Sequence, residues 1–267
     1  MTKIVIHAGF HKTGTSSVQA MLDKNRRILS RQLQLFLRPD FEDLAAAARE
    51  FSVKPNEERL TEVIRAAAVF FDGLDPEDPR PILMSSEDLS GHMPGRHGLD
   101  RYDAASLVMS QLAEAARLRF GESCKVQFYF STRAREDWLR SSWWQNLRST
   151  RLTLDFDTYC QQIAAAADLD TVLDDIADAV APDRVANCAL EVSTLSEHGP
   201  LTPLLDLLDI PEVTRAKLRL LPPENVQPGI GLEDALLALN RSGLNDHNLS
   251  EAKRLLRRIA NKQVKNG

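Results

Sequence analysis

The sequence predicts an α/β protein, in which a parallel β-sheet is flanked by helices on both faces. Short apolar runs alternate along the chain with longer segments of helical periodicity, and this is the pattern of a parallel sheet whose strands are connected by helices. The 267 residues are 43% hydrophobic, which is enough to bury one substantial core. The sequence has no internal repeat and no linker long enough to separate a pair of domains, so we expect one domain over residues 1–267.

The N-terminal half of the chain predicts two strands and four helices. Val18, Met21 and Leu22 share one side of the first helix, and two later helices have alanine-rich apolar faces. A segment rich in proline and acidic residues, DPEDPRP, separates those helices from the next apolar run. In chain order, the predicted elements are a strand over 3–8, a helix over 15–29, helices over 42–50 and 57–72, a strand at 82–84 and a helix over 100–119.

The C-terminal half of the chain predicts two further strands and a helical end. The apolar run VQFYF, 126–130, is expected to form a buried strand with a helix after it. A helical pattern over 157–180 follows, and the sequence RVANCAL together with Glu191 and Val192 indicates a fourth strand. The remaining sequence is helical and ends in the basic stretch AKRLLRRIANKQVKNG.

Composition and charge argue against several classes of function. The formal net charge is −5 and the pI is about 5.7, whereas nucleic-acid-binding proteins usually carry a basic excess, so no nucleic-acid partner is expected. Cys124, Cys160 and Cys188 are widely spaced, which favours free thiols in a reducing compartment. The N-terminus enters a strand directly, and no apolar stretch is long enough for a membrane span. The simplest interpretation is a cytoplasmic enzyme.

The first predicted strand is followed by a loop typical of phosphate-binding sites. After Gly9, the sequence HKTGTSS brings a lysine, a glycine and several hydroxyl groups together immediately before a helix. Such a loop directs backbone N–H groups and the positive end of the helix at one point, where a phosphate can bind. The loop is not a Walker A motif, because Lys12 precedes Gly14 instead of following a second glycine. The alternative interpretation is a strand-to-helix turn with solvated polar residues.

This order of lysine, threonine, glycine and two hydroxyl residues resembles the 5′-phosphosulfate-binding loop of the PAPS-dependent sulfotransferases (PAPS is 3′-phosphoadenosine 5′-phosphosulfate). The resemblance implies a P-loop-like three-layer α/β domain, with PAPS as co-substrate and PAP as product. In that family the lysine lies near the sulfuryl group being transferred, a role that falls here on Lys12. By the same resemblance, the residues of this loop that bind PAPS are His11, Lys12, Thr13, Gly14, Thr15 and Ser16.

A second motif follows the strand predicted at 126–130. Arg133 comes after this strand, and Ser141 lies eight residues further on, in the next helix. An arginine at a strand end and a serine on the following helix can hold one phosphate from two directions. The segment resembles the 3′-phosphate-binding segment of the sulfotransferases, which implies that Arg133 and Ser141 bind the 3′-phosphate of PAPS. The chain departs from the family at Ala134, which stands near a place that often carries proline.

A general base is expected at the end of the second predicted strand, where the sequence reads SSEDLS. Sulfuryl transfer requires the acceptor hydroxyl to lose its proton, and a carboxylate within hydrogen-bonding reach can accept it. Several carbohydrate-acting sulfotransferases use glutamate for this step, and the resemblance favours Glu87. Asp88, His11 and His92 are the alternative bases. Structural alternatives are that Glu87 or Asp88 caps the next turn or pairs with Arg133.

The acceptor is predicted to be a hydroxyl on a carbohydrate or glycolipid, because of the glutamate and a helix rich in tryptophan. Trp138, Trp143 and Trp144 could line an acceptor cleft, although an amphipathic helix more often buries such side chains in the core. The helices over 42–72 are expected to shape this site. A glycine-rich loop, GHMPGRHG, could close over the acceptor.

The C-terminal region resembles the family more weakly. The segment PLLDLLDIP, 203–211, is similar to a leucine-rich helix of the family, and PENVQPG, 223–229, is similar to an asparagine-containing loop. In the basic tail, Lys262, Lys265 and Gly267 could contact the 3′-phosphate, as a basic segment does in the family. The alternative is a solvated basic helix.

The sequence therefore predicts a PAPS-dependent sulfotransferase that works by in-line transfer, with Lys12 and Glu87 as its catalytic residues. No metal site is expected, because the spacing of histidine, cysteine and acidic residues matches no ligand set. One alternative is a small-molecule kinase, which would need the GK[ST] sequence and a magnesium-binding carboxylate. The other is a sulfotransferase-like protein that binds nucleotide without transferring a group. The sequence carries no signal for an oligomeric state.

Overall fold

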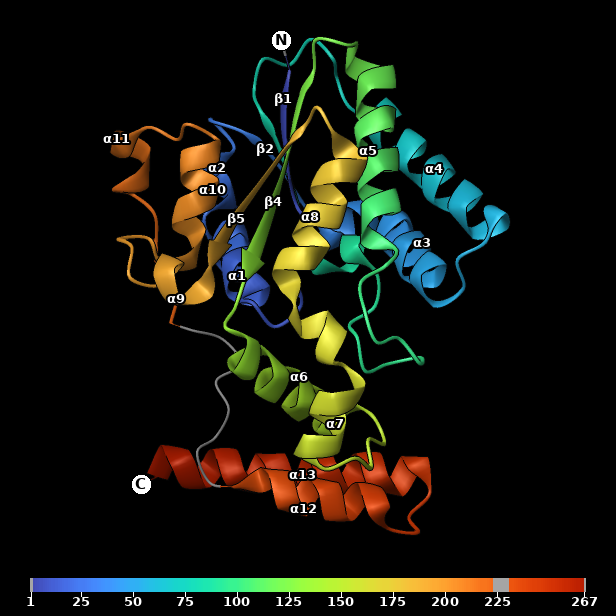
Figure 1. The fold of residues 1–267 in the computed structure, drawn as a ribbon. Coiled ribbons are helices and arrows are strands. Elements are labelled where there is room, and N and C mark those ends of the chain that lie inside the picture. Colours follow the sequence, from blue (N-terminus) through green and yellow to red (C-terminus); the bar gives the residue numbers. More distant parts are fainter. Residues whose placement is uncertain (1, 223–230, 267) are drawn as a thin grey trace.

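The computed structural model describes residues 2–222 and 231–266, and its centre is a five-stranded parallel sheet (Figure 1). The strand order β2-β3-β1-β4-β5 places the first strand of the chain in the middle. The strands are β1 (Lys3–His7), β2 (Gln34–Leu37), β3 (Ile82–Ser85), β4 (Lys125–Thr132) and β5 (Arg184–Ala189). All neighbouring strands are parallel, which confirms the predicted fold class. The loop predicted at 223–229 lies outside the described residues.

Helices connect the strands and continue beyond the last one (Figure 1). Those before β5 are α1 (Thr15–Lys24), α2 (Arg26–Leu29), α3 (Glu42–Val53), α4 (Glu57–Asp72), α5 (Ala105–Phe120), α6 (Arg135–Ser149), α7 (Phe156–Gln162) and α8 (Leu169–Val180). Those after β5 are α9 (Leu190–Ser193), α10 (Thr202–Leu207), α11 (Glu212–Arg215), α12 (Leu232–Arg241) and α13 (Asp246–Asn266). Short 3₁₀ helices are η1 (Arg38–Phe41), η2 (Glu87–Ser90), η3 (Ala164–Ala167) and η4 (Gly199–Leu201). Within the described ranges, no helix combines the length and the apolar character that crossing a bilayer needs.

Both faces of the sheet are buried beneath helices. In β1, Ile4 and Ile6 belong to the larger hydrophobic core, whereas Val5 belongs to a smaller core on the opposite face. The larger core includes residues of α3, α4, α5 and α8, and the smaller one includes residues of α1, α2 and α10 (Figure 1). Burial on both faces explains why the strands read as continuous apolar runs instead of alternating patterns.

Several predicted boundaries differ from the structure. Strand β2, Gln34–Leu37, was not predicted; it is a four-residue edge strand whose residues alternate between half-buried and buried. The helix predicted over 157–180 is divided into α7, η3 and α8, and the Asp168 side chain caps α8. The helix predicted over 100–119 begins only at Ala105.

Asn25 divides the helix predicted over 15–29 into α1 and α2. Its side-chain Nδ2 donates hydrogen bonds to the carbonyl oxygens of Met21 (2.8 Å) and Arg219 (2.9 Å). Its Oδ1 accepts a hydrogen bond from the Arg219 backbone N–H at 2.8 Å. The buried Asn25 side chain therefore stops α1 and holds a segment far along the chain against it.

Helices α12 and α13 lie across the far end of α6 (Figure 1). Asn240 of α12 donates from Nδ2 to the carbonyl oxygens of Leu147 (3.1 Å) and Leu152 (2.7 Å). Lys253 of α13 donates from Nζ to the carbonyl oxygens of Leu147 (2.7 Å) and Thr150 (2.6 Å). Burial lowers the pKa of Lys253 to about 8. These two buried side chains satisfy a carbonyl group in the last turn of α6 and two carbonyl groups of the residues that follow it.

Candidate functional site

A cavity of about 660 Å³ opens at the carboxyl-terminal edge of the sheet, and the segments that follow β1, β3, β4 and β5 all contribute to its lining. Ligands of parallel α/β sheets bind at this edge because loops from several strands converge there. The lining includes these sequence-predicted residues: His11, Lys12, Gly14, Thr15, Ser16, Glu87, Arg133 and Ser141.

The loop after β1 directs the N-terminus of α1 into the cavity. Lys12 has a φ of 67° and Gly14 a φ of 92°, so the chain turns sharply before the helix begins at Thr15. A Cβ atom on Gly14 would lie 2.7 Å from Cδ1 of Leu190, so glycine is required here for space as well as for conformation. The first turn of α1 contains no acidic residue, which leaves the positive end of this helix available to an anion.

The Thr13 side chain is the one predicted ligand of this loop that does not face the cavity. Its hydroxyl is buried, donates to the carbonyl oxygen of Phe10 at 2.6 Å and lies 2.7 Å from the hydroxyl oxygen of Ser131. Ser131 Oγ in turn donates to the carbonyl oxygen of Gly9 at 3.1 Å. The prediction that the Thr13 hydroxyl binds phosphate is wrong, because this hydroxyl joins the loop to β4.

Lys12 lies among other positive side chains. Burial and, after it, the neighbouring charges of Arg148 and Arg133 together lower the pKa of Lys12 to about 8, while Glu87 opposes the shift. Arg133 Nη1 also donates a hydrogen bond to the carbonyl oxygen of Lys12 at 3.2 Å. Like charges held this close, partly out of water, favour binding of an anion between them.

One face of α6 lines the cavity with polar side chains. Ser141, Gln145 and Arg148 are spaced four and three residues apart, so they project from the same side of the helix. Gln145 Oε1 accepts hydrogen bonds from Arg148 Nε, at 2.8 Å, and from Arg148 Nη2. Ser141 was predicted as a site residue and the other two were not, although their helical spacing from Ser141 was a usable signal.

Glu87 begins η2, directly after β3. Its Oε2 accepts a hydrogen bond from Gln19 Nε2 of α1 at 2.7 Å. Ser86, not Glu87, caps the turn, because its side chain accepts the backbone N–H of Asp88 at 3.2 Å. Among the described residues, Glu87 forms no ion pair with Arg133, so neither structural alternative for Glu87 is found.

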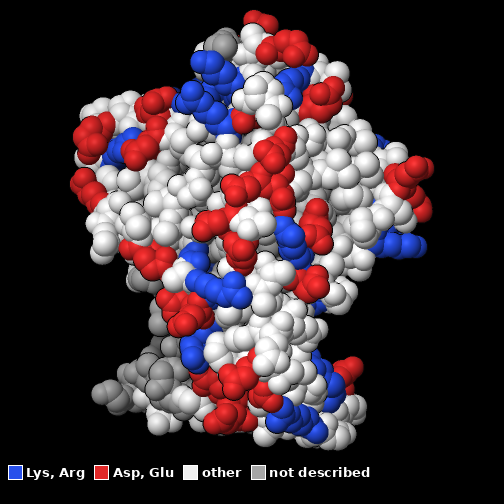
Figure 2. Space-filling view, viewed as in Figure 1, with Lys and Arg blue, Asp and Glu red and all other residues white. Residues whose placement is uncertain are grey.

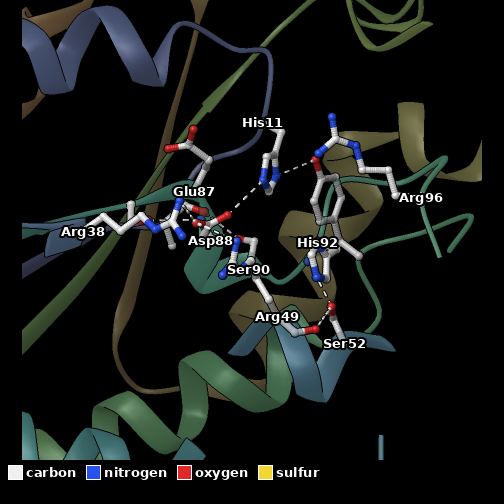
Figure 3. A network of polar contacts seen from close by, with 12 residues as sticks. His11, Arg38, Arg49, Ser52, Glu87, Asp88, Ser90, His92 and Arg96 are labelled. Atoms are coloured by element: carbon white, nitrogen blue, oxygen red, sulfur yellow. Dashed lines mark hydrogen bonds and ion pairs between the residues drawn. The ribbon is translucent and has the colours of Figure 1, made fainter. Parts of the chain in front are cut away.

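Asp88 is the centre of a polar network (Figure 3). Its carboxylate lies 3.0 Å from Arg38 Nη1, 3.9 Å from Arg49 Nη1 and 3.6 Å from His11 Nε2. Burial raises the pKa of Asp88, but the hydrogen bond and charge of His11 and the charges of Arg38 and Arg49 outweigh it and hold this pKa below its ordinary value. Asp88 is thus engaged in positioning side chains and is a poor proton acceptor. His11 is held from its other side, where Nδ1 lies 3.3 Å from the Tyr102 hydroxyl.

The loop that follows η2 contributes His92 to the cavity lining. The His92 backbone N–H donates to Ser52 Oγ of α3 at 2.9 Å, so this loop rests on α3. Burial and, after it, the charge of the adjacent His97 ring, 4.4 Å away between centroids, lower the pKa of His92 to about 4. His92 is therefore neutral near pH 7.

The tryptophans of α6 pack in the core, as the second interpretation of this helix expected, and do not line the cavity. Trp138, Trp143 and Trp144 are all buried in the larger core, and none of them lines the cavity. Trp138 Nε1 donates to the carbonyl oxygen of His11 at 2.8 Å and Trp143 Nε1 to that of Leu154 at 3.1 Å. Trp138 therefore supports the loop after β1 from the side of the core.

Positively charged side chains, and not the tryptophans, line the cavity. The chain is acidic overall, and the acidic residues of α8 face solvent on the side drawn in Figure 2. The two carboxylates of the cavity lining, Glu87 and Asp88, are outnumbered by cations. These cations are Lys12, Arg38, Arg49, Arg96, Arg133 and Arg148. Four of these cations were not predicted, because they come from separate segments that only the fold brings together. They are Arg38, Arg49, Arg96 and Arg148.

The basic tail, as far as the structure describes it, does not contribute to this cavity. Lys262 is exposed and lines a separate hollow of about 380 Å³, together with Arg254, Arg257, Arg258 and Asn261. Lys262 does not line this cavity, so the expected contact between Lys262 and a 3′-phosphate bound here is not found. The side chain of Lys265 and all of Gly267 lie outside the described residues. Within the described ranges, no group of three or more histidine, cysteine or acidic side chains is arranged to hold a metal ion.

Comparisons with known proteins find similarity among solved structures. No protein-family model matches the sequence, and no curated protein sequence matches it. Among solved structures, the chain is similar to the crystal structure of a sulfotransferase from Alicyclobacillus acidocaldarius. The identity is 14%, the match covers 94% of this chain and 98% of that chain, and the TM-score is 0.46. A likeness at this level does not establish a shared function.

Proposed function

We propose that this protein transfers the sulfuryl group of PAPS to a hydroxyl group of an acceptor. The observation that carries the proposal is a convergence in one cavity. The glycine-containing loop with Lys12, the pair Arg133 and Ser141, and the carboxylate Glu87 come from three strand ends and line the same space. These three features suit a ligand with two separate anionic groups and a reaction that releases a proton. The loop with Lys12 and the pair Arg133 and Ser141 would each bind one anionic group, and Glu87 would accept the proton.

The co-substrate is proposed to bind across the ends of β1 and β4. Lys12 and the backbone N–H groups at the start of α1 would hold the 5′-phosphosulfate, as helix N-termini hold anions. Arg133 and Ser141 would hold the 3′-phosphate through charge-assisted hydrogen bonds. Arg133 also contacts the Lys12 carbonyl oxygen, which is consistent with two adjoining subsites for one nucleotide.

The transfer step is a direct displacement at sulfur. The acceptor oxygen forms a bond to sulfur while the bond from sulfur to the 5′-phosphate oxygen breaks, and PAP leaves with that electron pair. Lys12 would stabilise the negative charge that grows on the leaving oxygen. Glu87 would take the proton of the acceptor hydroxyl, oriented by the hydrogen bond that it accepts from Gln19.

Calorimetric titration with PAP, AMP and ADP tests the proposal. PAP should bind at least about tenfold more tightly than AMP, because a charge-assisted hydrogen bond contributes roughly 1.5–3 kcal/mol and only PAP carries the 3′-phosphate. Equal affinity for PAP and AMP would contradict the assignment of Arg133 and Ser141. Preference for ADP over PAP would favour the alternative kinase activity instead.

A further inference from the structure

Three further arginines line the cavity beside the residues of the proposed PAPS site. The PAPS site proposed above, on which this inference rests, uses cations that follow β1 and β4. Arg38 of η1, Arg49 of α3 and Arg96 of the loop after η2 line the cavity from other elements. These three, named the acceptor-side arginines below, are drawn together with the proposed base Glu87 in Figure 3.

The nearby carboxylates neutralise the charges of the acceptor-side arginines to different degrees. Arg38 is neutralised twice, by Asp88 at 3.0 Å and by Glu42 at 2.9 Å. Arg49 has only the longer contact of 3.9 Å with the same Asp88 carboxylate, and its buried Nε has no hydrogen-bond partner among the described residues. Arg49 therefore keeps binding capacity for an anion in the cavity.

Arg96 has neutral hydrogen-bond partners only. Its Nε donates to Asn146 Oδ1 at 2.9 Å and its Nη2 donates to Ser149 Oγ at 2.8 Å. No carboxylate among the described residues forms an ion pair with it. The Arg96 side chain is half-buried, so its charge is partly removed from water, and this burial lowers its pKa. A half-buried guanidinium without a carboxylate is unfavourable until an anion binds it.

The backbone that carries Arg96 is fixed against α6. Gly95 has a φ of 84°, and a Cβ atom at this position would lie 2.7 Å from Asn146 Nδ2 and 2.8 Å from the Tyr159 hydroxyl oxygen. Asn146 Nδ2 donates to that Tyr159 oxygen at 2.9 Å and to the carbonyl oxygen of Pro94 at 3.4 Å. Arg96 is thus held in place before any ligand arrives, which lowers the entropic cost of binding.

We propose that the acceptor carries a fixed anionic group, a sulfate, phosphate or carboxylate, which binds Arg49 and Arg96 while its hydroxyl lies at Glu87. The chemistry of transfer is unchanged: the hydroxyl oxygen bonds to sulfur, its proton passes to Glu87, and PAP leaves with the electron pair of the broken bond. The anionic group takes no part in this step and serves to position the hydroxyl. A neutral sugar would leave both guanidinium groups without an anion.

The test uses probes that differ in charge, titrated onto protein saturated with PAP so that the nucleotide site is filled. The probes are glucose, glucuronate and inorganic sulfate. We expect glucuronate and sulfate to bind at least about tenfold more tightly than glucose, since bonds to charged groups are the strong ones. Arg49→Gln and Arg96→Gln should each reduce this preference by about tenfold. Arg65→Gln is the matched control, because Arg65 is an exposed arginine of α4 that pairs only with Glu62.

Several outcomes would overturn this proposal. Equal binding of glucose and glucuronate contradicts it, as does an anion preference that survives both substitutions, or no binding of sulfate at millimolar concentration. If a Gln variant does not fold, as judged by circular dichroism, Arg96→Lys replaces it and should keep some of the preference. Failure of PAP to bind would instead contradict the proposed function, and the same titrations without PAP then decide whether the arginines bind anions.

Discussion

Arg133 and Lys12, which follow two neighbouring strands, are joined by a hydrogen bond of 3.2 Å from Arg133 Nη1 to the Lys12 carbonyl oxygen. Lys12 has a positive φ, so its backbone benefits from a contact that fixes this unusual conformation. Replacing Arg133 would therefore disturb the loop after β1 as well as any ligand. The role of the 3′-phosphate subsite is measured more cleanly at Ser141, which lines the cavity from α6 without contacting that loop by any hydrogen bond among the described residues.

Ser141→Ala should lower the affinity for PAP by roughly 10- to 150-fold and leave the affinity for AMP unchanged. The hydroxyl would bond a charged phosphate that only PAP carries, and such a bond contributes roughly 1.5–3 kcal/mol. The ratio of the two dissociation constants, measured by calorimetry, is the readout. Ser250→Ala, an exposed serine on α13, is the control and should keep the wild-type ratio. An equal loss for PAP and AMP would place Ser141 elsewhere than at the 3′-phosphate.

The affinity for PAP should fall as the pH rises through about 8. The pKa of Lys12 in the free protein is lowered to about 8, and a bound anion favours the charged form and raises this pKa again. Affinity is therefore constant below the pKa of the free protein and decreases by up to about tenfold per pH unit above it. Titrations from pH 7 upward avoid protonation of the phosphates themselves, whose second pKa is about 6.

The variant Lys12→Ala should show no such decrease in PAP affinity and should lose transfer activity, with an unchanged circular dichroism spectrum. Lys24→Ala, at the exposed end of α1, is the matched control for this measurement. A decrease in affinity above pH 8 that persists in Lys12→Ala would assign the titration to another group.

Glu87→Gln should reduce turnover by roughly 10²–10⁴, the usual range for loss of a general base. The amide keeps the size of the side chain and can still accept the hydrogen bond from Gln19, so PAP binding should be preserved. Transfer of radiolabelled sulfuryl groups and PAP titration are measured on the same preparation. Glu114→Gln, at an exposed position of α5, controls for the loss of a carboxylate. If PAP binding disappears together with turnover, Glu87 has a structural role and is not the base.

Gly14→Ala should lower the free energy of unfolding by about 2–4 kcal/mol and weaken PAP binding. Positive φ strain contributes on the order of 1 kcal/mol, and the clash with Leu190 adds about 1–3 kcal/mol of overpacking. Gly98→Ala separates the two effects, because Gly98 also has a positive φ of 78° but a Cβ atom there has no neighbour within 4 Å. Urea denaturation should show a clearly smaller loss for Gly98→Ala. Similar losses of unfolding free energy in the two variants would mean that the Leu190 side chain moves aside without an energetic penalty.

The fold class, and the segments after β1, β3 and β4 that contribute to the cavity lining, could be predicted from the sequence because they depend on local patterns. Doubly buried strands appear as short apolar runs, and the polar residues after them mark the ligand edge of a parallel sheet. The edge strand β2 was missed because four residues, only two of them buried, carry too little periodicity. Thr13 was assigned to the phosphate because local sequence does not show which way a hydroxyl points in a loop.

The arginines of the cavity could not be predicted from local patterns. Arg38, Arg49 and Arg96 lie on separate elements, and nothing in their immediate sequence distinguishes them from solvated surface residues. The sequence favoured Glu87 over Asp88 as the base only through a resemblance. The tertiary contacts that distinguish the two carboxylates could not be predicted: arginines of η1 and α3 engage Asp88 and, among the described residues, form no ion pair with Glu87.

The end of α6 connects the cavity to the C-terminal helices. Arg148 lines the cavity, and the adjacent Leu147 provides the carbonyl oxygen that side chains of α12 and α13 bind. Burial lowers the pKa of Arg148, and the positive charge of Arg257 on α13 lowers it further, so an anion beside Arg148 relieves repulsion between the two helices. We therefore expect occupancy of the cavity and docking of α13 to be thermodynamically linked. Saturation with PAP should slow amide hydrogen exchange in α13, although no described residue of that helix lines the cavity, so the C-terminal helix would report from a distance on whether the site is filled.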